Sequence, residues 1–460
     1  MLRDAVRVVP TPSSDASGPA PWVWAVVVLA ICHAAAVATF QILNVLVESI
    51  KADLVLTDTQ YSLIQGLAVA VFASALGIPA ARIADHGHRR LIVLIGVVTW
   101  SVATVACAFA RSFPELFAAR MLVGLGEAFL YPAALSMIAD VAPRQRLSTA
   151  IGIFGCGGPI GTAFALIGGG WLVRNPGGIG RDLFWGISAT WRAGFLMCSV
   201  FGGLAACLLM TLPEPRRSGD VVPQRKNLVG TLSHVRLHWK VFAGVSGTML
   251  ALSYCVFAIS SWSLTMLVRT HGLSYAAVGS MAGFAAVAGG MAGAWVAGAV
   301  TDKLDAVGHR DAALRVAIAV AALMVITTAV PVLGVSAEWA VLSVCGAYCV
   351  LGMPTVLGGT ALQQISPSPI RAQVMAIQVL LVNLLALSLG PLTVALLTDH
   401  VFKRTDSIGY ALLWTVAIGA FVAICAVLGC RRQFVTSRDL IDDEPHAMLR
   451  GDGHYRGEGC

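Results

Sequence analysis

The chain has 460 residues, of which 57% are hydrophobic and 12% are charged. Ordinary soluble domains contain roughly 45 to 50% apolar and about 25% charged residues, so this composition excludes a soluble globular protein. The formal net charge of +7 lies mainly in the connections between apolar runs. We interpret it as a signal of membrane topology and expect no nucleic-acid partner.

Twelve apolar runs of roughly 19 to 27 residues follow one another, and each is long enough to cross a hydrocarbon core about 30 Å thick. The predicted spans are approximately 22–46, 60–81, 91–110, 115–139, 149–173, 192–212, 241–267, 275–300, 315–334, 339–362, 372–398 and 408–430. The runs are continuous and do not alternate, which excludes an outer-membrane barrel. The sequence predicts an all-α membrane protein with twelve transmembrane helices.

The basic residues are distributed unequally over the two sides that these spans define. The side with both termini carries 22 of the 31 Lys and Arg residues, and the opposite side carries 8. Cytoplasmic connections are enriched in Lys and Arg, so we expect both termini in the cytoplasm and the chain in the inner (plasma) membrane.

The longest polar connection divides the spans into two sets of six. The predicted units are a cytoplasmic tail (1–21), a six-helix bundle (22–212), a cytoplasmic loop (213–240), a second six-helix bundle (241–430) and a cytoplasmic tail (431–460). Features recur between the halves, because Asp302 follows span eight as Asp85 follows span two, and Gly390-Pro391 repeats Gly158-Pro159. Such a repeat is typical of secondary transporters, which bind substrate between pseudo-symmetric halves near the midplane.

The loop after span two, with Asp85, Arg89 and Arg90, resembles the signature loop of the major facilitator superfamily, although Ala81 replaces its first glycine. The segment from Arg120 to Ala128 resembles the Arg-containing helix motif of the same superfamily. The resemblance implies two pseudo-symmetric six-helix bundles. It also implies that Asp85, Arg89 and Arg90 form a cytoplasmic gate with Asp302 and Lys303 that latches the halves in the outward-open state. The other reading of these charges is purely topogenic.

Finer features resemble the bacterial spinster-like transporters and extend over nearly the whole chain. They are Ile50-Lys51-Ala52-Asp53-Leu54, Leu56-Thr57-Asp58-Thr59-Gln60, Gly126-Glu127-Ala128, Trp191-Arg192, Glu214-Pro215, and Arg371-Ala372 through Asn383 and Gly390-Pro391 to Asp399. One departure is Thr39-Phe40 in span one, where many members carry Asp-Arg. Glu127 would therefore carry proton coupling without that partner.

Among the charged residue types, Arg120 and Glu127 lie well inside the predicted spans. A charge at the bilayer centre costs at least roughly 2.5 to 3.5 kcal/mol, so each is a functional candidate. Seven helical residues bring them to the same face. We expect Glu127 to bind and release protons and Arg120 to hold an anionic group, while a permanent structural ion pair between them stays the alternative.

Further polar and aromatic residues lie in spans that commonly line the cavity of the superfamily. The candidates for substrate contact are Gln41, Asn44, Tyr131, Tyr254, Trp262, Gln378 and Asn383, each with packing as its alternative. His33 in span one is a candidate for a proton relay or for a neutral packing residue.

The sequence lacks the Gly-rich phosphate loop of ATPases, clustered metal ligands, and the HExxH and GxSxG enzyme motifs. We therefore expect no enzyme activity, no cofactor, no metal and no ATP site. The predicted function is secondary active transport of a small organic, anionic or amphipathic solute by a functional monomer, with protons as coupling ion. The alternatives are a drug or toxic-metabolite efflux antiporter and, from another class, a non-transporting membrane sensor or enzyme.

Overall fold

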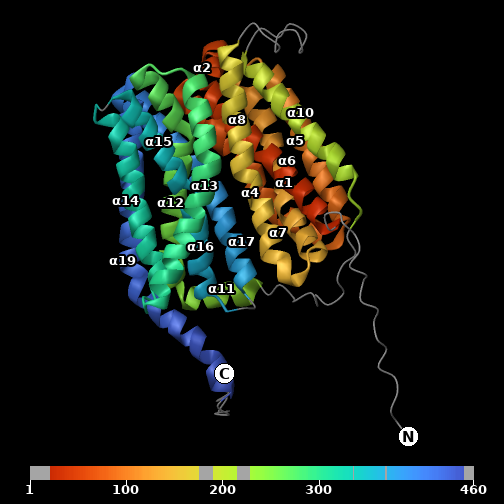
Figure 1. The fold of residues 1–460 in the computed structure, drawn as a ribbon, viewed down its shortest axis with the longest axis vertical. Helices are drawn as coiled ribbons and strands as arrows, with labels where there is room; N and C mark the ends of the chain where they lie inside the picture. Colours follow the sequence, from red (N-terminus) through yellow and green to blue (C-terminus); the bar gives the residue numbers. More distant parts are fainter. Residues whose placement is uncertain (1–20, 176–189, 215–227, 335, 368–369, 450–460) are drawn as a thin grey trace.

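A computed structural model describes residues 21–175, 190–214, 228–334, 336–367 and 370–449. Within these ranges, twelve helices are long and apolar enough to span a membrane, which confirms the predicted fold class. The beginning of α1 and the end of α19 lie at the same end of the molecule (Figure 1). We call this the proximal end, and we call the opposite end, which holds the turn between α2 and α3, the distal end.

The helices of the first half run alternately between the two ends. They are α1 (Pro21–Gln41), α2 (Leu43–Leu54), α3 (Asp58–Ser62), η1 (Leu63–Leu67), α4 (Ala68–His86), α5 (Arg89–Phe109), α6 (Phe113–Val141), η2 (Arg144–Arg146), α7 (Leu147–Gly155), α8 (Gly157–Arg174) and α10 (Thr190–Met210). We call this group the N bundle.

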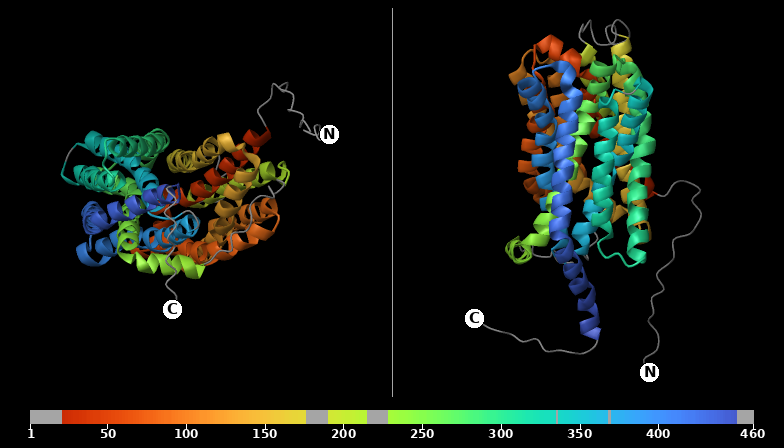
Figure 2. Two further views of the ribbon diagram at one scale, coloured as in Figure 1. Left: turned by 90° about the horizontal axis from the view of Figure 1, so that it is seen from below. Right: turned by 90° about the vertical axis from the view of Figure 1, so that its left-hand side faces the viewer.

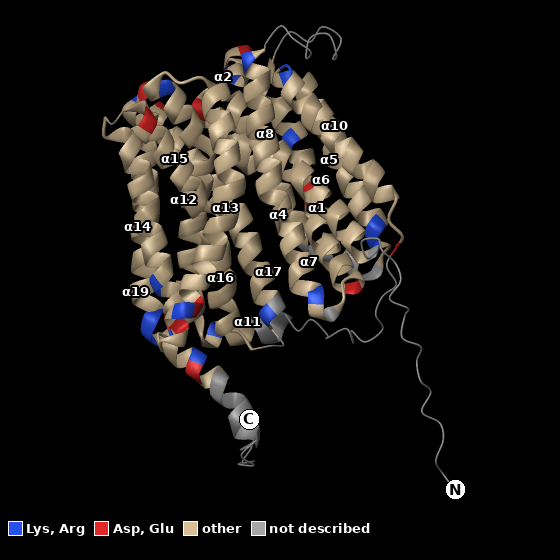
Figure 3. Ribbon diagram, viewed as in Figure 1, with Lys and Arg blue, Asp and Glu red and all other residues tan. Residues whose placement is uncertain are grey.

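The second half forms the C bundle, which lies beside the N bundle when the molecule is seen from the proximal end (Figure 2). Its elements are α11 (Leu228–Leu237), α12 (Trp239–His271), α13 (Tyr275–Ala306), α14 (Ala312–Val332), α15 (Ala337–Leu351), α16 (Met353–Gln364), α17 (Arg371–Leu381), η3 (Val382–Ala386), α18 (Leu387–Leu396), η4 (Leu397–Phe402), η5 (Thr405–Ser407) and α19 (Ile408–Leu449). Charged residues gather at the two ends of both bundles and are rare between them (Figure 3).

The bundles touch most closely toward the distal end, where glycines remove the side chain between two backbones. A Cβ on Gly66 of η1 would lie 2.5 Å from the carbonyl oxygen of Leu387, and one on Gly279 of α13 would lie 2.6 Å from that of Leu166. Both η1 and η3, which lie in the facing spans two and eleven, are π-helical turns. Such turns are frequent at functional sites. In Figure 1 the two bundles diverge toward the proximal end.

Two expected boundaries differ from the structure. The connection 213–240 contains the short helix α11 and the start of α12, while its residues 215–227 lie outside the described part of the chain. The last helix does not end near residue 430 but continues to Leu449. Its extension still packs, because Phe434 is fully buried and Arg438 is 7% exposed.

Ion pairs at the proximal end fasten the extension of α19 to the turn between α13 and α14. Arg438 donates two hydrogen bonds of 2.7 Å to the carboxylate of Asp305. Two turns nearer the membrane, Arg431 pairs with Asp311, which also accepts from Arg315 at 2.8 Å. Burial opposes ionisation of Asp311, but the two guanidinium groups hold the pKa of its carboxyl below its usual range.

The Arg438→Gln substitution is expected to lower the free energy of unfolding by about 2 kcal/mol, because it removes two charge-assisted hydrogen bonds to a partly buried carboxylate. Thermal unfolding in detergent measures the effect. Arg146→Gln is the matched control, since Arg146 is an exposed arginine at the same end. Equal melting temperatures for the two variants would contradict a stabilising role for Arg438.

Candidate functional site

A chain of polar side chains connects the two bundles in the interior of the molecule. Asn44 donates to Gln41 at 2.7 Å, and Gln41 donates to Thr162 of α8 at 3.4 Å. Ser260 of α12 donates to the same Gln41 amide oxygen at 3.3 Å, so this hydrogen bond crosses from the C bundle to the N bundle. The structure thus brings together the predicted residues Gln41 and Asn44 and adds Thr162 and Ser260, which the sequence did not single out.

Gln65 of η1 completes this polar chain from the second span. Its amide nitrogen donates to Asn44, while its amide oxygen is buried without a hydrogen-bond partner among the described residues. The side chains of Gln65 and Asn44 have no exposed surface. A buried amide with an unused acceptor is costly in an apolar environment, so this position is suited to accept a hydrogen bond in another state of the molecule.

Helix α6 carries the two charged residues of the membrane interior. Arg120 is fully buried and donates from Nη1 to the carbonyl oxygen of Thr39 at 3.3 Å, whereas its Nε and Nη2 groups have no partner among the described residues. Glu127 is partly exposed as a residue, but its Oε1 atom is buried and unpartnered. No described hydrogen bond joins the two side chains, so the expected alternative of a structural ion pair is not formed in this conformation.

Three rings from three helices pack next to this part of α6. The hydroxyl of Tyr131 lies 3.3 Å from Nε2 of His33, and Nδ1 of His33 lies 3.0 Å from the carbonyl oxygen of Phe154. Because a carbonyl only accepts, this geometry assigns the proton to Nδ1 of a neutral His33 and leaves Nε2 to accept from Tyr131. Tyr131 is 49% exposed and follows Glu127 by one helical turn.

The predicted substrate residues of the C bundle have different surroundings. Tyr254 and Asn383 are partly exposed. Gln378 on α17 is 6% exposed, and neither atom of its amide has a described partner. Trp262 instead is fully buried, and its indole N–H donates to the carbonyl oxygen of Pro391 at 3.0 Å. In this conformation Trp262 is a packing residue of the distal half.

Four charged side chains at the distal end form a cluster that crosses between the bundles. Arg269, in the last turn of α12, donates to both carboxylate oxygens of Asp58 at 2.8 and 2.9 Å and to Glu48 at 2.7 Å. Lys51 pairs with Asp58 from the other side. We call these four residues the distal cluster. It contains two acids and two bases, so the charges that it buries are balanced.

Two further contacts close the distal end beside this cluster. The backbone N–H and the hydroxyl of Thr59, in the first turn of α3, both donate to Asp399 of η4 at 2.7 Å. Ser62 donates to the carbonyl oxygen of Pro391 at 3.1 Å. The capping box of Thr57 and Gln60 fixes the start of α3 and so holds Asp58 and Thr59 toward the C bundle.

The sequence did not assign a role to the distal cluster. In the sequence, Lys51 and Asp58 lie in the segments that carry the family resemblance, and Arg269 follows span seven on the side with fewer basic residues. The available signal was the position of these charges immediately beside apolar runs. It gave no information on which acid meets which base.

The described ion pairs and hydrogen bonds of Arg89 and Arg90, two of the expected gate residues at the proximal end, lie within the first half of the chain in this conformation. Arg89 pairs with Asp140 of α6 and with Glu214, which follows α10, and the backbone N–H groups of Arg89 and Arg90 donate to Glu214 at 3.0 and 2.9 Å. On the C bundle, Asp302 and Lys303 are exposed. The side chain of Asp85 lies outside the described part of the structure.

No group of three or more His, Cys, Asp or Glu side chains among the described residues is arranged to hold a metal ion. The chemistry available in the interior is therefore that of amide, hydroxyl and ring groups around one carboxyl and one guanidinium. These groups are suited to binding and proton exchange.

The Arg269→Gln substitution is expected to open the distal end, because it removes the guanidinium of the C bundle that binds Asp58 and Glu48 of the N bundle. Hydrogen exchange followed by mass spectrometry should show faster exchange in peptides around residues 48–62 and 266–275. The control is Arg404→Gln, which breaks an exposed distal pair with Asp406 inside the C bundle. Unchanged exchange in Arg269→Gln would show that the cluster does not hold this end closed.

The Major Facilitator Superfamily model matches residues 29–391 of the chain. An MFS-type efflux pump of Mycolicibacterium smegmatis is 28% identical over 408 residues, which cover 87% of this chain and 90% of that protein. The puromycin resistance protein of Streptomyces alboniger is 28% identical over 268 residues, or 57% of this chain and 48% of that protein.

A solved structure has a similar fold. It is that of a bacterial homologue of the human lysosomal transporter spinster, in an inward-facing and unoccupied conformation, with a TM-score of 0.72 and 23% identity over 93% of this chain and 99% of that one. These comparisons confirm the expected family. The family and the relatives reported above are transporters, as expected. The chain belongs to the Major Facilitator Superfamily of membrane transporters, and its fold is similar to that of a bacterial spinster homologue.

Proposed function

We propose that the chain is a secondary active transporter of a small organic, anionic or amphipathic solute, coupled to protons through Glu127. The observation that carries the proposal is the state of buried Arg120 and partly buried Glu127 on α6. Glu127 and Arg120 both keep hydrogen-bonding atoms without described partners, while the charges of the distal cluster are paired. Unpaired charges in an apolar interior are costly, so their retention favours a role in binding.

We further propose that the protein lies in the inner membrane and that its proximal end faces the cytoplasm. The basis is the excess of Lys and Arg on the side of the termini, 22 against 8. With this orientation, the closed distal end makes the conformation inward-facing. In this proposal Arg89, Arg90, Asp302 and Lys303, which no described contact joins across the bundles, belong to a gate that forms only when the transporter faces outward.

Glu127 is suited to couple transport to protons because protonation removes its charge. The carboxylate finds no described donor for Oε1 in this conformation, so binding a proton lowers the cost of keeping the side chain in the interior. Alternating access exposes the same carboxyl first to one side of the membrane and then to the other. The cycle needs no second intramembrane acid, and the expected unit of transport is a monomer.

The Glu127→Gln variant is expected to lose accumulation driven by a pH gradient while it keeps exchange of substrate, because glutamine imitates the protonated carboxyl. Everted and right-side-out vesicles are incubated with radiolabelled aliphatic carboxylates, aromatic carboxylates and a lysophospholipid, with and without an imposed pH gradient, to measure accumulation. Exchange is measured in vesicles that already contain the unlabelled solute. Glu115→Gln is the control, since Glu115 is an exposed acid at the distal end of the same helix. Gradient-driven accumulation that survives in Glu127→Gln would exclude coupling through this residue.

Arg120 supplies the positive charge that favours an anionic solute. Its two unpartnered groups, Nε and Nη2, form one edge of the guanidinium, which is the geometry that a carboxylate or phosphate accepts. Because Arg120 has no exposed surface here, a solute reaches this edge only when neighbouring groups of α1 move.

The Arg120→Lys variant keeps the positive charge and loses the two-donor edge. We expect the KM for an anionic solute to rise by roughly tenfold or more, with a smaller change for an uncharged amphipathic solute, since bidentate recognition is lost. Transport kinetics in vesicles measure this difference. Equal changes for both solutes would assign Arg120 to a structural role in the N bundle.

A second candidate function is efflux of drugs or toxic metabolites. It is favoured by the efflux pump of Mycolicibacterium smegmatis, which is similar over nearly the full length of both chains. The vesicle assay distinguishes the two functions when ethidium is added to the panel. Proton-driven uptake of ethidium into everted vesicles supports efflux, and uptake of an organic acid into right-side-out vesicles supports import.

A further inference from the structure

The imidazole ring of His33, on α1, is enclosed by residues of three other helices. It stacks on Phe154 of α7 with 4.9 Å between the ring centroids, and it meets Tyr131 of α6 edge-on at 5.1 Å. On the side of α8, a Cβ at Gly157 would lie 3.0 Å from Nδ1, and one at Gly158 would lie 3.5 Å from Cε1. The glycines therefore leave the space that the ring fills, and His33 is 7% exposed.

This ring lies on the side of α1 that faces the C bundle. Phe40 follows His33 by seven residues, or nearly two helical turns, so the two side chains share one face of α1. Phe40 contacts Phe257 of α12 in the other bundle, with 6.5 Å between the ring centroids. His33 lies two turns nearer the proximal end, toward which the two bundles diverge (Figure 1).

The two nitrogens of His33 have different roles in this arrangement. Nδ1 donates to the carbonyl oxygen of Phe154 at 3.0 Å, and Nε2 accepts from the hydroxyl of Tyr131 at 3.3 Å. The hydroxyl has one proton, so while it donates to His33 its oxygen can only accept from other groups. A proton on Nε2 reverses this contact, because both nitrogens of an imidazolium donate. The O–H of Tyr131, which is 49% exposed, is then free to donate elsewhere.

We propose that His33 takes up a proton when an anionic solute binds at Tyr131. The inference rests on the proposed transport function and states how the same site recognises its solute. The proton comes from water at the open proximal end and bonds to the lone pair of Nε2. No covalent bond breaks in the protein, since the Tyr131 O–H turns about its C–O bond and donates to the carboxylate or phosphate of the solute.

The proton and the anion stabilise each other at this position. An imidazolium that is 7% exposed is costly in an apolar interior unless an opposite charge lies close to it. An anion beside Tyr131 is costly for the same reason as long as the hydroxyl donates to His33. Together they form a neutral pair that the tyrosine hydroxyl connects. Proton binding and anion binding therefore strengthen each other by the same factor.

The other titratable groups on the enclosing helices do not contact His33. Helix α7 contains none, α8 contains Arg174 at its distal end, and the thiol of Cys156 lies between the two helices. On α6, Glu127 lies one turn and Arg120 about three turns beyond the tyrosine, and no described hydrogen bond or ion pair joins either of them to His33. In the proposed cycle Glu127 exchanges the proton that the gradient drives, and His33 holds the proton that accompanies the anion.

The test is nuclear magnetic resonance of the full chain in detergent, with labelled histidine rings, from pH 5 to pH 8. The probes are benzoate and, as the uncharged counterpart, benzyl alcohol. We expect benzoate to raise the proton affinity of His33 roughly tenfold, a size typical of coupling between two sites, and benzyl alcohol to leave it unchanged. The His33→Asn variant identifies the signal by its loss, and its amide N–H can still donate to the Phe154 carbonyl.

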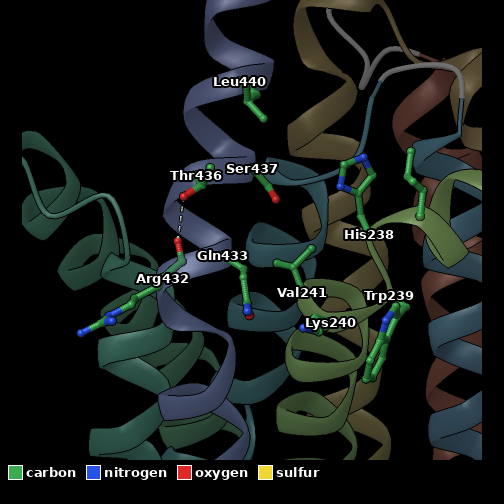
Figure 4. Close-up of a pocket in the computed structure, with 10 residues that line it drawn as sticks. His238, Trp239, Lys240, Val241, Arg432, Gln433, Thr436, Ser437 and Leu440 are labelled. Atoms are coloured by element: carbon green, nitrogen blue, oxygen red, sulfur yellow. Dashed lines mark hydrogen bonds between the residues drawn. The ribbon is translucent and has the colours of Figure 1, made fainter.

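His238 is the internal control for unspecific binding of anions. It lines a groove between the start of α12 and the extension of α19, across from Gln433 and Ser437 (Figure 4). Lys240 lines the same groove, so a surface effect of benzoate would appear at His238 as well. We expect the His238 signal not to respond to the probe. An equal response of both histidines would overturn the inference.

Anion exchange in vesicles with equal pH on both sides gives a second readout. The KM of the wild type for benzoate should rise about tenfold from pH 6 to pH 8, whereas that of His33→Asn should change less than twofold. The Tyr131→Phe variant keeps the ring and should show at pH 6 the high KM that the wild type has at pH 8.

Two outcomes would identify His33 as a neutral packing residue and overturn the inference. One is a proton affinity of His33 that benzoate does not change, and the other is a wild-type pH profile in His33→Asn. Wild-type vesicles that exchange no carboxylate at any pH would instead contradict the proposed function. The resonance experiment needs no transport, so it decides the role of His33 in that case too.

Discussion

The pairing of Arg269 with Asp58 and Glu48 joins the two bundles at the distal end, and the proposed alternation of the open end depends on it. Asp58 is fully buried and Arg269 is 9% exposed, so breaking the pair in place would leave a buried charge without compensation. The cost of that state keeps the distal end closed as long as the partners remain together. Thr59 and Asp399 add a second hydrogen-bonded contact between the bundles. Because the bundles are rigid helical units, closure at one end leaves them apart at the other.

At the distal end the charged groups are paired, whereas in the interior several polar groups have no described partner. There the amides of Gln65 and Gln378, the carboxyl of Glu127 and the guanidinium of Arg120 all keep unused atoms. A folded protein normally satisfies its buried polar groups, so the presence of such exceptions at these four residues is informative. It indicates a surface prepared to exchange partners, which is what a transporter needs between binding and release. We propose that the paired ends provide stability and that the unpaired middle is the place where the solute and the proton bind.

Much of the fold could be predicted from the sequence, because run length, Lys and Arg placement and the repeat of Asp85 at Asp302 are local signals. The distal cluster could not be predicted, since Asp58 and Arg269 are 211 positions apart and no local pattern pairs them. Trp262 was expected at the cavity but is buried against Pro391, because a helix that is apolar on all sides does not reveal which face meets its neighbours. The sequence does not predict the extension of α19, because the segment after residue 430 is polar and carries no apolar pattern that would indicate the burial of Phe434 and Arg438.

The central claim is that the two ends open in alternation, under control of the distal cluster. The most direct test is a pair of spin-label distances in one membrane preparation. One pair is placed at the exposed distal residues Ala52 and Leu333, and the other at the exposed proximal residues Gln145 and Ala306. In a variant with Asp58→Asn, the distal distance should lengthen while the proximal distance shortens. If both distances lengthen, or only the distal one changes, the bundles do not rock as rigid bodies and the account is wrong.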